Sequence, residues 1–387
     1  MPPRVLFVAS LHHPQELLRE RATLAAGQPM PLFPTSMSQR YWERAMQARG
    51  YTVDVFWRNL PGWGGSIEQL KAERHSQRIT PRKIVNAAMR RLPPQMNLDL
   101  RQRNSKLLKY ALEFQPDWLW LVGDNTVIYA ETLAEIKART KCQIIYASGT
   151  SPIVFSHAIE REAARLYDWV LVNDYYHGIQ WLELGAKRME CLPIVAIDPD
   201  YHRPLDLPAE ERARYACDVS FVGTITPPNL YSERIAALEA LQGFNVGLWS
   251  VHDVPVSLTP WVRGEALGET MFRVLSVAKI SLNVHGDFMR WGGNMRLFEA
   301  AALGAFQISD NRPGIATWFT PGEHLVLYDN VDHLRELVAH YLAHPQERVD
   351  IANAALVHAR AHHTYAHRLT RLEMLMSEME GKNRDGL

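Results

Sequence analysis

The chain alternates short continuous apolar runs with longer stretches of helical periodicity, and this alternation constrains its fold more than any other feature. Apolar runs bounded by polar or glycine residues are typical of strands buried on both faces, and helices between such strands produce a mostly parallel sheet. We therefore predict an α/β, doubly wound chain. The predicted strands are 5–9, 51–57, 117–122, 143–147, 169–172, 219–222, 245–249, 280–284, 306–309 and 325–328, and the predicted helices are 38–49, 126–139, 157–167, 232–241, 294–303 and 331–343.

The length of 387 residues exceeds what one hydrophobic core fills, since single cores stop growing near roughly 250 to 300 residues. The strand and helix rhythm breaks over 192–216, where Pro193, Pro199, Pro204 and Pro208 indicate an irregular connector. The sequence thus predicts two domains with a ligand cleft between them. The expected boundaries are 1–191 for the N-terminal domain, 192–216 for the linker, 217–365 for the C-terminal domain and 366–387 for a closing helix.

The overall charge argues against a polyanionic partner. Forty-two Lys and Arg balance forty-two Asp and Glu, so no global field draws the protein to nucleic acid. Three scattered cysteines, Cys142, Cys191 and Cys217, fit a reducing cytoplasm. No stretch reaches the roughly 20 apolar residues of a membrane helix, and the N-terminus reads as a first strand. We expect a cytoplasmic protein.

One segment departs from this neutrality. Residues 71–109 contain eleven Lys or Arg against two acids, Glu73 and Asp99. A solvated helical pair inserted in the first domain explains such a run, because charged faces usually meet water. The alternative is a docking face for an anionic acceptor or for the inner face of a membrane.

The stretch around residues 280–304 carries the strongest chemical signal. A buried strand ends at His285, glycines follow at Gly292 and Gly293, and a helix begins near Asn294. The C-terminal ends of parallel strands face the ligand crevice, and a helix start offers unpaired N–H groups to an anion such as pyrophosphate. Arg296 could add a fixed cation, with Asn294 as the helix cap.

Six pieces of the second half match a known family in order. They are Asp218-Val-Ser-Phe-Val-Gly223, Lys279-Ile-Ser-Leu-Asn283, Met295-Arg-Leu-Phe-Glu-Ala300 with Gly304, Pro321-Gly-Glu323, His344-Pro345 with Glu347-Arg348, and His363-Thr-Tyr-Ala-His-Arg368. With these pieces the region 218–374 resembles the glycosyltransferase group 1 superfamily, most closely its CgeB-like (spore maturation protein) branch.

This resemblance implies a GT-B fold, in which two Rossmann-like domains face each other across a cleft. The C-terminal domain would hold a nucleotide-sugar donor without a metal or other cofactor, and the N-terminal domain would present a hydroxyl-bearing acceptor. Glu299 matches the second glutamate of the superfamily motif, which binds the donor ribose. Trp291 stands where the first glutamate is expected. The expected donor-site residues are Gly223, Thr224, Trp249, Ser250, Asn283, His285, Gly292, Gly293, Asn294, Met295, Arg296 and Glu299.

Several of these positions have a competing structural explanation. Gly223 and Thr224 could simply form a tight strand-to-helix turn, with Arg234 in the next helix. Trp249 could be a buried core residue. His285 could be a satisfied polar residue at a strand end.

In the N-terminal half, Asp124 follows a strand and is the best candidate for a general base acting on an acceptor hydroxyl. Capping of the next helix by Asp124 or Asn125 explains the same residues. His12 and His13, which follow Ser10 and the first strand, are further catalytic candidates. The loop 148–152 and His157 complete the expected wall of the site.

Two patterns are set aside. Asp198 and Asp200 have the spacing of a metal site but lie in the proline-bearing connector, and the cluster His362, His363 and His367 begins a closing helix. No Gly-x-Gly-x-x-Gly follows the first strand and no P-loop occurs, which argues against a dinucleotide-binding oxidoreductase and a P-loop NTPase.

We therefore expect a glycosyltransferase, with Arg296 stabilising the departing diphosphate. A noncatalytic nucleotide-sugar sensor or assembly protein is the alternative, and an enzyme that isomerises or hydrolyses its nucleotide-sugar is a third.

Overall fold

The computed structural model describes residues 2–10, 38–59 and 96–384, which form two compact units. The first unit comprises Met1–Val172 and His177–Ile194, and the second comprises Asn173–Tyr176 and Val195–Leu387. The short segment Asn173–Tyr176 thus packs with the second unit although both of its flanks belong to the first. None of the helices in the described ranges is long and apolar enough to cross a membrane.

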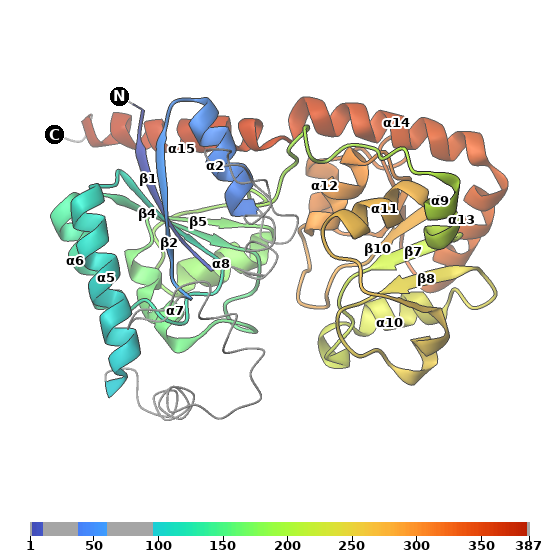
Figure 1. Cartoon of the computed structure of the whole chain (residues 1–387), viewed down its shortest axis with the longest axis horizontal. Coiled ribbons are helices and arrows are strands. Elements are labelled where there is room, and N and C mark those ends of the chain that lie inside the picture. The colour runs from blue at the N-terminus through green and yellow to red at the C-terminus, as the bar shows by residue number, and fades with distance from the viewer. Residues whose placement is uncertain (1, 11–37, 60–95, 385–387) are drawn as a thin grey trace. The chain divides into compact units, whose positions relative to one another are not determined.

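The first unit is built on a parallel sheet of six described strands with helices beside it (Figure 1). Its spatial order is β2 (Thr52–Trp57), β1 (Arg4–Ala9), β3 (Trp118–Val122), β4 (Gln143–Ser148), β5 (Trp169–Val172) and β6 (Met189–Glu190). The helices are α2 (Ser38–Ala48), α5 (Leu98–Phe114), α6 (Ala130–Thr140), α7 (Ala158–Ala163) and α8 (Tyr175–Glu183), of which the first two residues of α8 belong to the second unit. Central strands such as β5 are buried throughout, as their continuous apolar sequence predicts.

The second unit repeats this architecture with another parallel sheet. Its spatial order is β12 (Val326–Tyr328), β11 (Gln307–Asp310), β10 (Ile280–Asn283), β7 (Val219–Val222), β8 (Val246–Trp249) and β9 (Val262–Gly264). The helices are α9 (Ala209–Tyr215), α10 (Ser232–Glu239), α11 (Glu269–Val277), α12 (Met295–Ala302), α13 (Val331–Ala343), α14 (Pro345–His362) and α15 (Tyr365–Arg384). This strand order reverses between β7 and β10, as in a dinucleotide-binding sheet.

Two apolar layers cover the faces of the second sheet. One contains residues of α10 and α13, among them Leu238 and Leu334, together with the strands. The other contains residues of α9, α11 and α12, among them Phe272 and Ala300. Each helix buries one stripe against the sheet, which is why helices flank both faces of this sheet (Figure 1).

The α/β, doubly wound prediction is confirmed, and every predicted strand is present with its bounds shifted by at most one residue. The sequence reading missed the short edge strands β6 and β9 and several helices, including α11 and α14. The expectation of an irregular connector over all of 192–216 is wrong, because α9 occupies Ala209–Tyr215. Most of the basic segment 71–109 lies outside the described residues; its end, from residue 98, belongs to α5.

Candidate functional site

The candidate site lies where the strand order of the second sheet reverses. β7 and β10 are neighbours there, and their C-terminal ends lead to Gly223 and to His285. Open α/β sheets bind ligands beyond the carboxyl ends of the strands at this reversal. The structure therefore brings Gly223, Thr224, Asn283 and His285 to one edge of one sheet.

His285 is fully buried and joins three elements of this edge. Its Nδ1–H donates to Oδ1 of Asp310 at 2.6 Å, and its Nε2 accepts from the backbone N–H of Asn294 at 3.1 Å. Burial raises the pKa of the Asp310 carboxyl, but the donors of His285 together with Arg312 outweigh burial and hold the pKa below its ordinary value. His285 is thus a satisfied positioning residue in this structure.

Asn294 caps α12 and fastens it to the neighbouring strand. Its side-chain oxygen accepts from the N–H of Leu297 at 3.3 Å, and its Nδ2 donates to Oδ1 of Asn283 at 2.7 Å. Asn283 in turn donates to Oγ of Ser309 at 3.3 Å. The predicted helix cap is confirmed, and the chain of amides fixes where α12 begins relative to β10 and β11.

The turn before α12 differs most from the sequence expectation, because internal acceptors take its backbone N–H groups. Oδ2 of Asp174 accepts from Trp291 at 2.7 Å and from Gly292 at 2.8 Å. Gly293 donates to the carbonyl of Asn173 at 3.3 Å. With the N–H of Asn294 bonded to His285, the turn 291–294 holds a carboxylate of the protein where an anionic ligand was expected.

The two glycines of this turn allow close packing against other parts of the protein rather than the approach of a ligand to the backbone. A Cβ on Gly292 would lie 1.7 Å from the carbonyl oxygen of Asn173. A Cβ on Gly293 would lie 2.8 Å from a methyl of Leu297 and 2.9 Å from the ring of Trp318. Glycine is required at position 292 because another backbone segment occupies the space.

Arg296 and Glu299 form an ion pair at the first turn of α12. Their side chains are 14% and 8% exposed, and the distance from Nη1 to Oε2 is 2.7 Å. Arg296 also contacts the carbonyl of Val222 at 3.4 Å, while no partner for its Nε is found among the described residues. Burial lowers the pKa of Arg296, and Glu299 partly offsets this. Arg296 was expected to face a diphosphate and Glu299 to face a ribose. In this structure the two side chains instead neutralise each other.

Arg234 ties together the loops that follow β7 and β10. It donates to the carbonyl of Thr224 at 2.5 Å and to that of Val284 at 2.7 Å, while its guanidinium lies 4.6 Å from the ring centre of Tyr231. Burial lowers its pKa. The Gly223–Thr224 turn is therefore held in place by a buried arginine.

Trp249 and Ser250 end β8. Trp249 is 3% exposed and packs in the core layer with Met271 and Phe272, in agreement with its structural explanation. Ser250 is partly exposed, and its Oγ accepts from the N–H of His252 at 3.2 Å. Met295, at the N-terminus of α12, is 46% exposed.

A cavity of about 340 Å³ opens beside this edge, beyond the ends of β11 and β12. Arg312 lies in its wall and pairs with Oδ2 of Asp310 at 2.9 Å and with Glu233. Burial lowers the pKa of Arg312, but these two carboxylates outweigh burial and raise it. The other lining residues are Ala236, Ala237, Asn311, Tyr328, Asp329, Asn330 and Val331.

In the first unit, Asp124 lies exposed just beyond β3. Capping of the next helix does not explain it, because Tyr129 occupies the N-cap of α6, and the side chain of Asn125 instead bonds to both backbone groups of Ile128. Asp124 acts on the buried Arg58, whose pKa is lowered to about 10 chiefly by burial and raised in part by Asp124 and Glu160. Within the described ranges no hydrogen bond or ion pair holds Asp124, and its charge acts on a buried cation.

The remaining predicted residues of the first unit have local roles or lie outside the described residues. Oγ of Ser10 accepts from Arg58 at 3.1 Å, and Ser148 donates to the carbonyl of Thr150 at 2.9 Å. His157 caps α7 by accepting from the N–H of Ile159 at 3.3 Å. His12 and His13 lie outside the described residues.

The two patterns set aside in the sequence have structural explanations. Oδ1 of Asp198 accepts from the N–H of Asp200 at 3.0 Å, which closes a turn. His363 and His358 both donate from Nε2 to the carbonyl of Trp318 at 2.7 Å.

Sequence reasoning missed Asp174, Arg312, Glu233 and Arg58. Asp174 follows β5, Arg312 follows β11 and Arg58 follows β2. Each therefore carried the signal used elsewhere, a charged residue just after a predicted strand. Glu233 lies in the first turn of α10, and nothing in its local sequence pointed to the cavity.

Comparisons with known proteins agree with this architecture. Residues 232–374 match a family of glycosyl transferase-like domains. No curated protein sequence matches the chain significantly.

Solved structures resemble the chain over nearly its whole length. Sucrose-phosphate synthase from Thermosynechococcus elongatus matches with a TM-score of 0.61 at 13% identity, over 98% of this chain and 100% of that one. Anabaena HepE in complex with UDP-glucose matches with a TM-score of 0.59 at 12% identity, over 97% and 100%. The trehalose 6-phosphate synthase of Burkholderia multivorans matches with a TM-score of 0.57 at 12% identity, over 100% and 99%. The predicted GT-B fold is confirmed.

Proposed function

We propose that this protein is a glycosyltransferase that moves a sugar from a nucleoside-diphosphate sugar to a hydroxyl-bearing acceptor. One observation carries the proposal. The glycosyl transferase-like match over 232–374 contains β10, α12 and Glu299, which stand at the point where the strand order reverses. The sequence similarity and the ligand-binding position of the fold therefore coincide.

The donor binds at the N-terminus of α12. The first two N–H groups of that helix, on Met295 and Arg296, have no backbone acceptor among the described residues, and an anion there gains from the helix dipole. Donor binding also replaces the carboxylate of Asp174 at Trp291 and Gly292. Glu299 turns from Arg296 to the ribose, and the released guanidinium approaches the diphosphate. UDP-sugars are the first donors to test, because HepE was solved with UDP-glucose.

Transfer then requires a base and charge stabilisation. Asp124 takes the proton of the acceptor hydroxyl while the bond from that oxygen to the anomeric carbon forms. The bond from the anomeric carbon to the diphosphate breaks, and Arg296 with the α12 N-terminus stabilises the departing nucleoside diphosphate. No metal ion is needed, since these groups supply the positive charge.

The test begins with a thermal-shift screen of UDP, GDP, TDP and ADP and of their common sugars, because specific binding raises the melting temperature. A donor found in this way is then incubated with acceptor mixtures, and the sugar-bearing products are identified by mass spectrometry. A stabilising donor that is neither transferred nor hydrolysed would contradict the enzyme.

That outcome would favour the second candidate, a noncatalytic nucleotide-sugar sensor of the same fold. Trp291 in place of the first motif glutamate is the observation that supports it. Sugar release without an acceptor would instead indicate hydrolysis or isomerisation.

The finer assignments follow from the sequence. We place the chain in the CgeB-like branch of the glycosyltransferase group 1 superfamily, in the cytoplasm, with the basic segment 71–109 contacting an anionic acceptor or membrane surface. Binding to anionic vesicles at low salt and release at moderate salt would support the surface contact. Absence of binding at low salt would remove the membrane part.

A further inference from the structure

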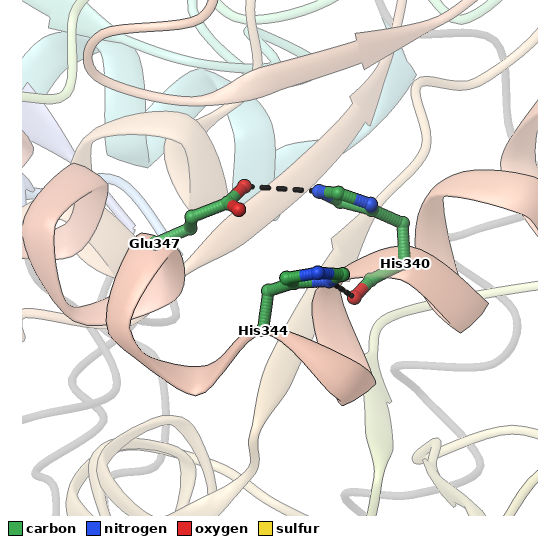
Figure 2. A group of neighbouring side chains, drawn as sticks. All are labelled: His340, His344 and Glu347. Carbon is green, nitrogen blue, oxygen red and sulfur yellow. Dashed lines mark hydrogen bonds and ion pairs between the residues drawn. The ribbon is translucent and has the colours of Figure 1, made fainter.

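Away from the candidate site, three metal-ligating side chains converge where α13 ends and α14 begins. They are His340, His344 and Glu347, and Figure 2 shows the two imidazoles and the carboxylate facing one another. One ligand atom from each lies within 4.8 Å of the others. Nε2 of His340 and Oε2 of Glu347 are 2.9 Å apart.

Local structure explains why these three residues meet. His340 and His344 are four residues apart at the end of one helix, so their side chains share a face. Pro345 begins α14 directly after His344, which places Glu347 in the first turn of the next helix. The stacked rings, with centres 4.1 Å apart, record this proximity.

His344 is already oriented as metal-binding histidines are. Its Nδ1–H donates to the backbone carbonyl of His340 at 2.7 Å, which leaves the lone pair on Nε2. A ligating imidazole usually donates its other ring N–H to a carbonyl or carboxylate in this way, and the bond fixes both tautomer and ring orientation. Arg348, the nearest cation in sequence, donates to the carbonyl of Tyr341 and so helps to hold the corner.

The surroundings favour a cation. The carboxylate of Glu347 supplies a negative charge, and the C-terminal end of α13 attracts positive charge while the N-terminal end of α14 opposes it, so the ligand set rather than the helix dipoles favours a cation. All three side chains are exposed, so rotamer changes can shorten 4.8 Å to the spacing of ligands around one ion, and water can complete the coordination.

We propose that His340, His344 and Glu347 bind one divalent first-row transition ion, with Zn²⁺ as the ion to test, and that the ion clips α13 to α14. Two imidazole nitrogens and a carboxylate oxygen suit zinc and its neighbours better than magnesium or calcium. The ion takes the place of the proton between His340 and Glu347, and that proton moves to Nδ1 of His340 or is released to solvent. The assignment does not depend on the proposed sugar transfer.

The experiment uses the full-length, untagged protein and zinc chloride. Calorimetry should show one zinc ion per chain at this site, and the melting temperature should rise with zinc. His340→Ala and His344→Ala should each weaken zinc binding about tenfold or more and abolish the stabilisation. His333→Ala, at a partly exposed position of the same helix, is the matched control and should bind zinc as the unmodified chain does.

A second measurement tests the three-ligand assignment. Cobalt(II) should give the visible absorption of a low-coordinate site, and Glu347→Gln should reduce both that absorption and zinc affinity. Zinc affinity and stabilisation that survive in both histidine variants would overturn the site. Loss in the histidine variants with full affinity in Glu347→Gln would overturn the carboxylate ligand.

Discussion

Oδ2 of Asp174 accepts a hydrogen bond from the backbone N–H of Gly292 at 2.8 Å, across 118 positions of sequence. The same oxygen accepts from Trp291, and Oδ1 accepts from Tyr176 at 2.9 Å. A fully buried carboxylate of the protein therefore fills the turn that precedes α12.

Two substitutions of Asp174 should separate its contribution to stability from its competition with the donor diphosphate for the N–H groups of the turn. Asp174→Ala leaves the N–H groups of Trp291, Gly292 and Tyr176 without this acceptor, and the loss at the buried Gly292 alone should lower the free energy of unfolding by about 1–3 kcal/mol. Asp174→Asn keeps an acceptor but removes the charge, and it should bind UDP or pyrophosphate more tightly than the unmodified chain. Urea unfolding and calorimetry measure the two effects. Unchanged or weaker ligand affinity in Asp174→Asn would show that the carboxylate does not compete with the donor.

Gly292→Ala should be more destabilising than Gly293→Ala. The added methyl at 292 meets the backbone carbonyl of Asn173 at 1.7 Å, which only a backbone shift relieves, whereas at 293 it meets the ends of two side chains. We expect Gly292→Ala to lose about 3 kcal/mol or more of unfolding free energy and Gly293→Ala about 1–3 kcal/mol, as for overpacking. Urea unfolding of both variants checks this order, and equal losses would contradict it.

The Arg296–Glu299 pair should show strong coupling. Arg296→Ala leaves a nearly buried carboxylate unpaired and should lower the unfolding free energy by about 3–5 kcal/mol, while Arg296→Met with Glu299→Leu should recover most of it.

In folded protein, Glu299→Ala should weaken nucleotide binding and Arg296→Ala should mainly slow turnover. A double-mutant cycle with calorimetry and product assays tests both statements. Additive stability effects, or full activity in both single variants, would argue against them.

Acidification should destabilise the protein through His363. Burial, with Arg368 adding to it, lowers the pKa of this histidine to about 3, whereas an unfolded histidine has an ordinary pKa near 6.5. Between these values the unfolded chain binds one more proton, so stability is full above about pH 6.5 and falls as the pH drops towards 3. From pH 7 to pH 5 the loss due to His363 should be about 2 kcal/mol. His363→Gln, which keeps a donor for Trp318, should lose this part of the pH dependence, and His333→Gln, at a partly exposed position, should retain it.

Removal of metal should leave sugar transfer unchanged. Arg296 and the α12 N-terminus supply the charge that stabilises the diphosphate, so a chelator should reduce the thermal stability gained from zinc without slowing turnover. Initial rates with and without EDTA make the comparison. A rate restored only by added magnesium or manganese would contradict the metal-free mechanism.

Much of the candidate site could be placed from the sequence, because it depends on local rules. Apolar runs of strand length between helical patterns specify the parallel sheets, and a residue that follows such a run is placed at the ligand edge without knowledge of the rest of the chain. Asn294 was recognised as a cap for a similar reason, since the bond to Leu297 spans only three residues. The sequence by itself thus determined the fold class, the strand edge and the start of α12.

The tertiary structure decided what these groups bind. The partners of the turn, Asp174 and Asn173, lie more than a hundred positions away, and Arg312 finds Glu233 across 79 positions. Local sequence patterns do not predict such pairings. A backbone N–H or a charged side chain has the same local sequence whether it binds a ligand or another part of the protein. Burial away from water then requires each of these groups to find a partner, and folding supplied internal ones.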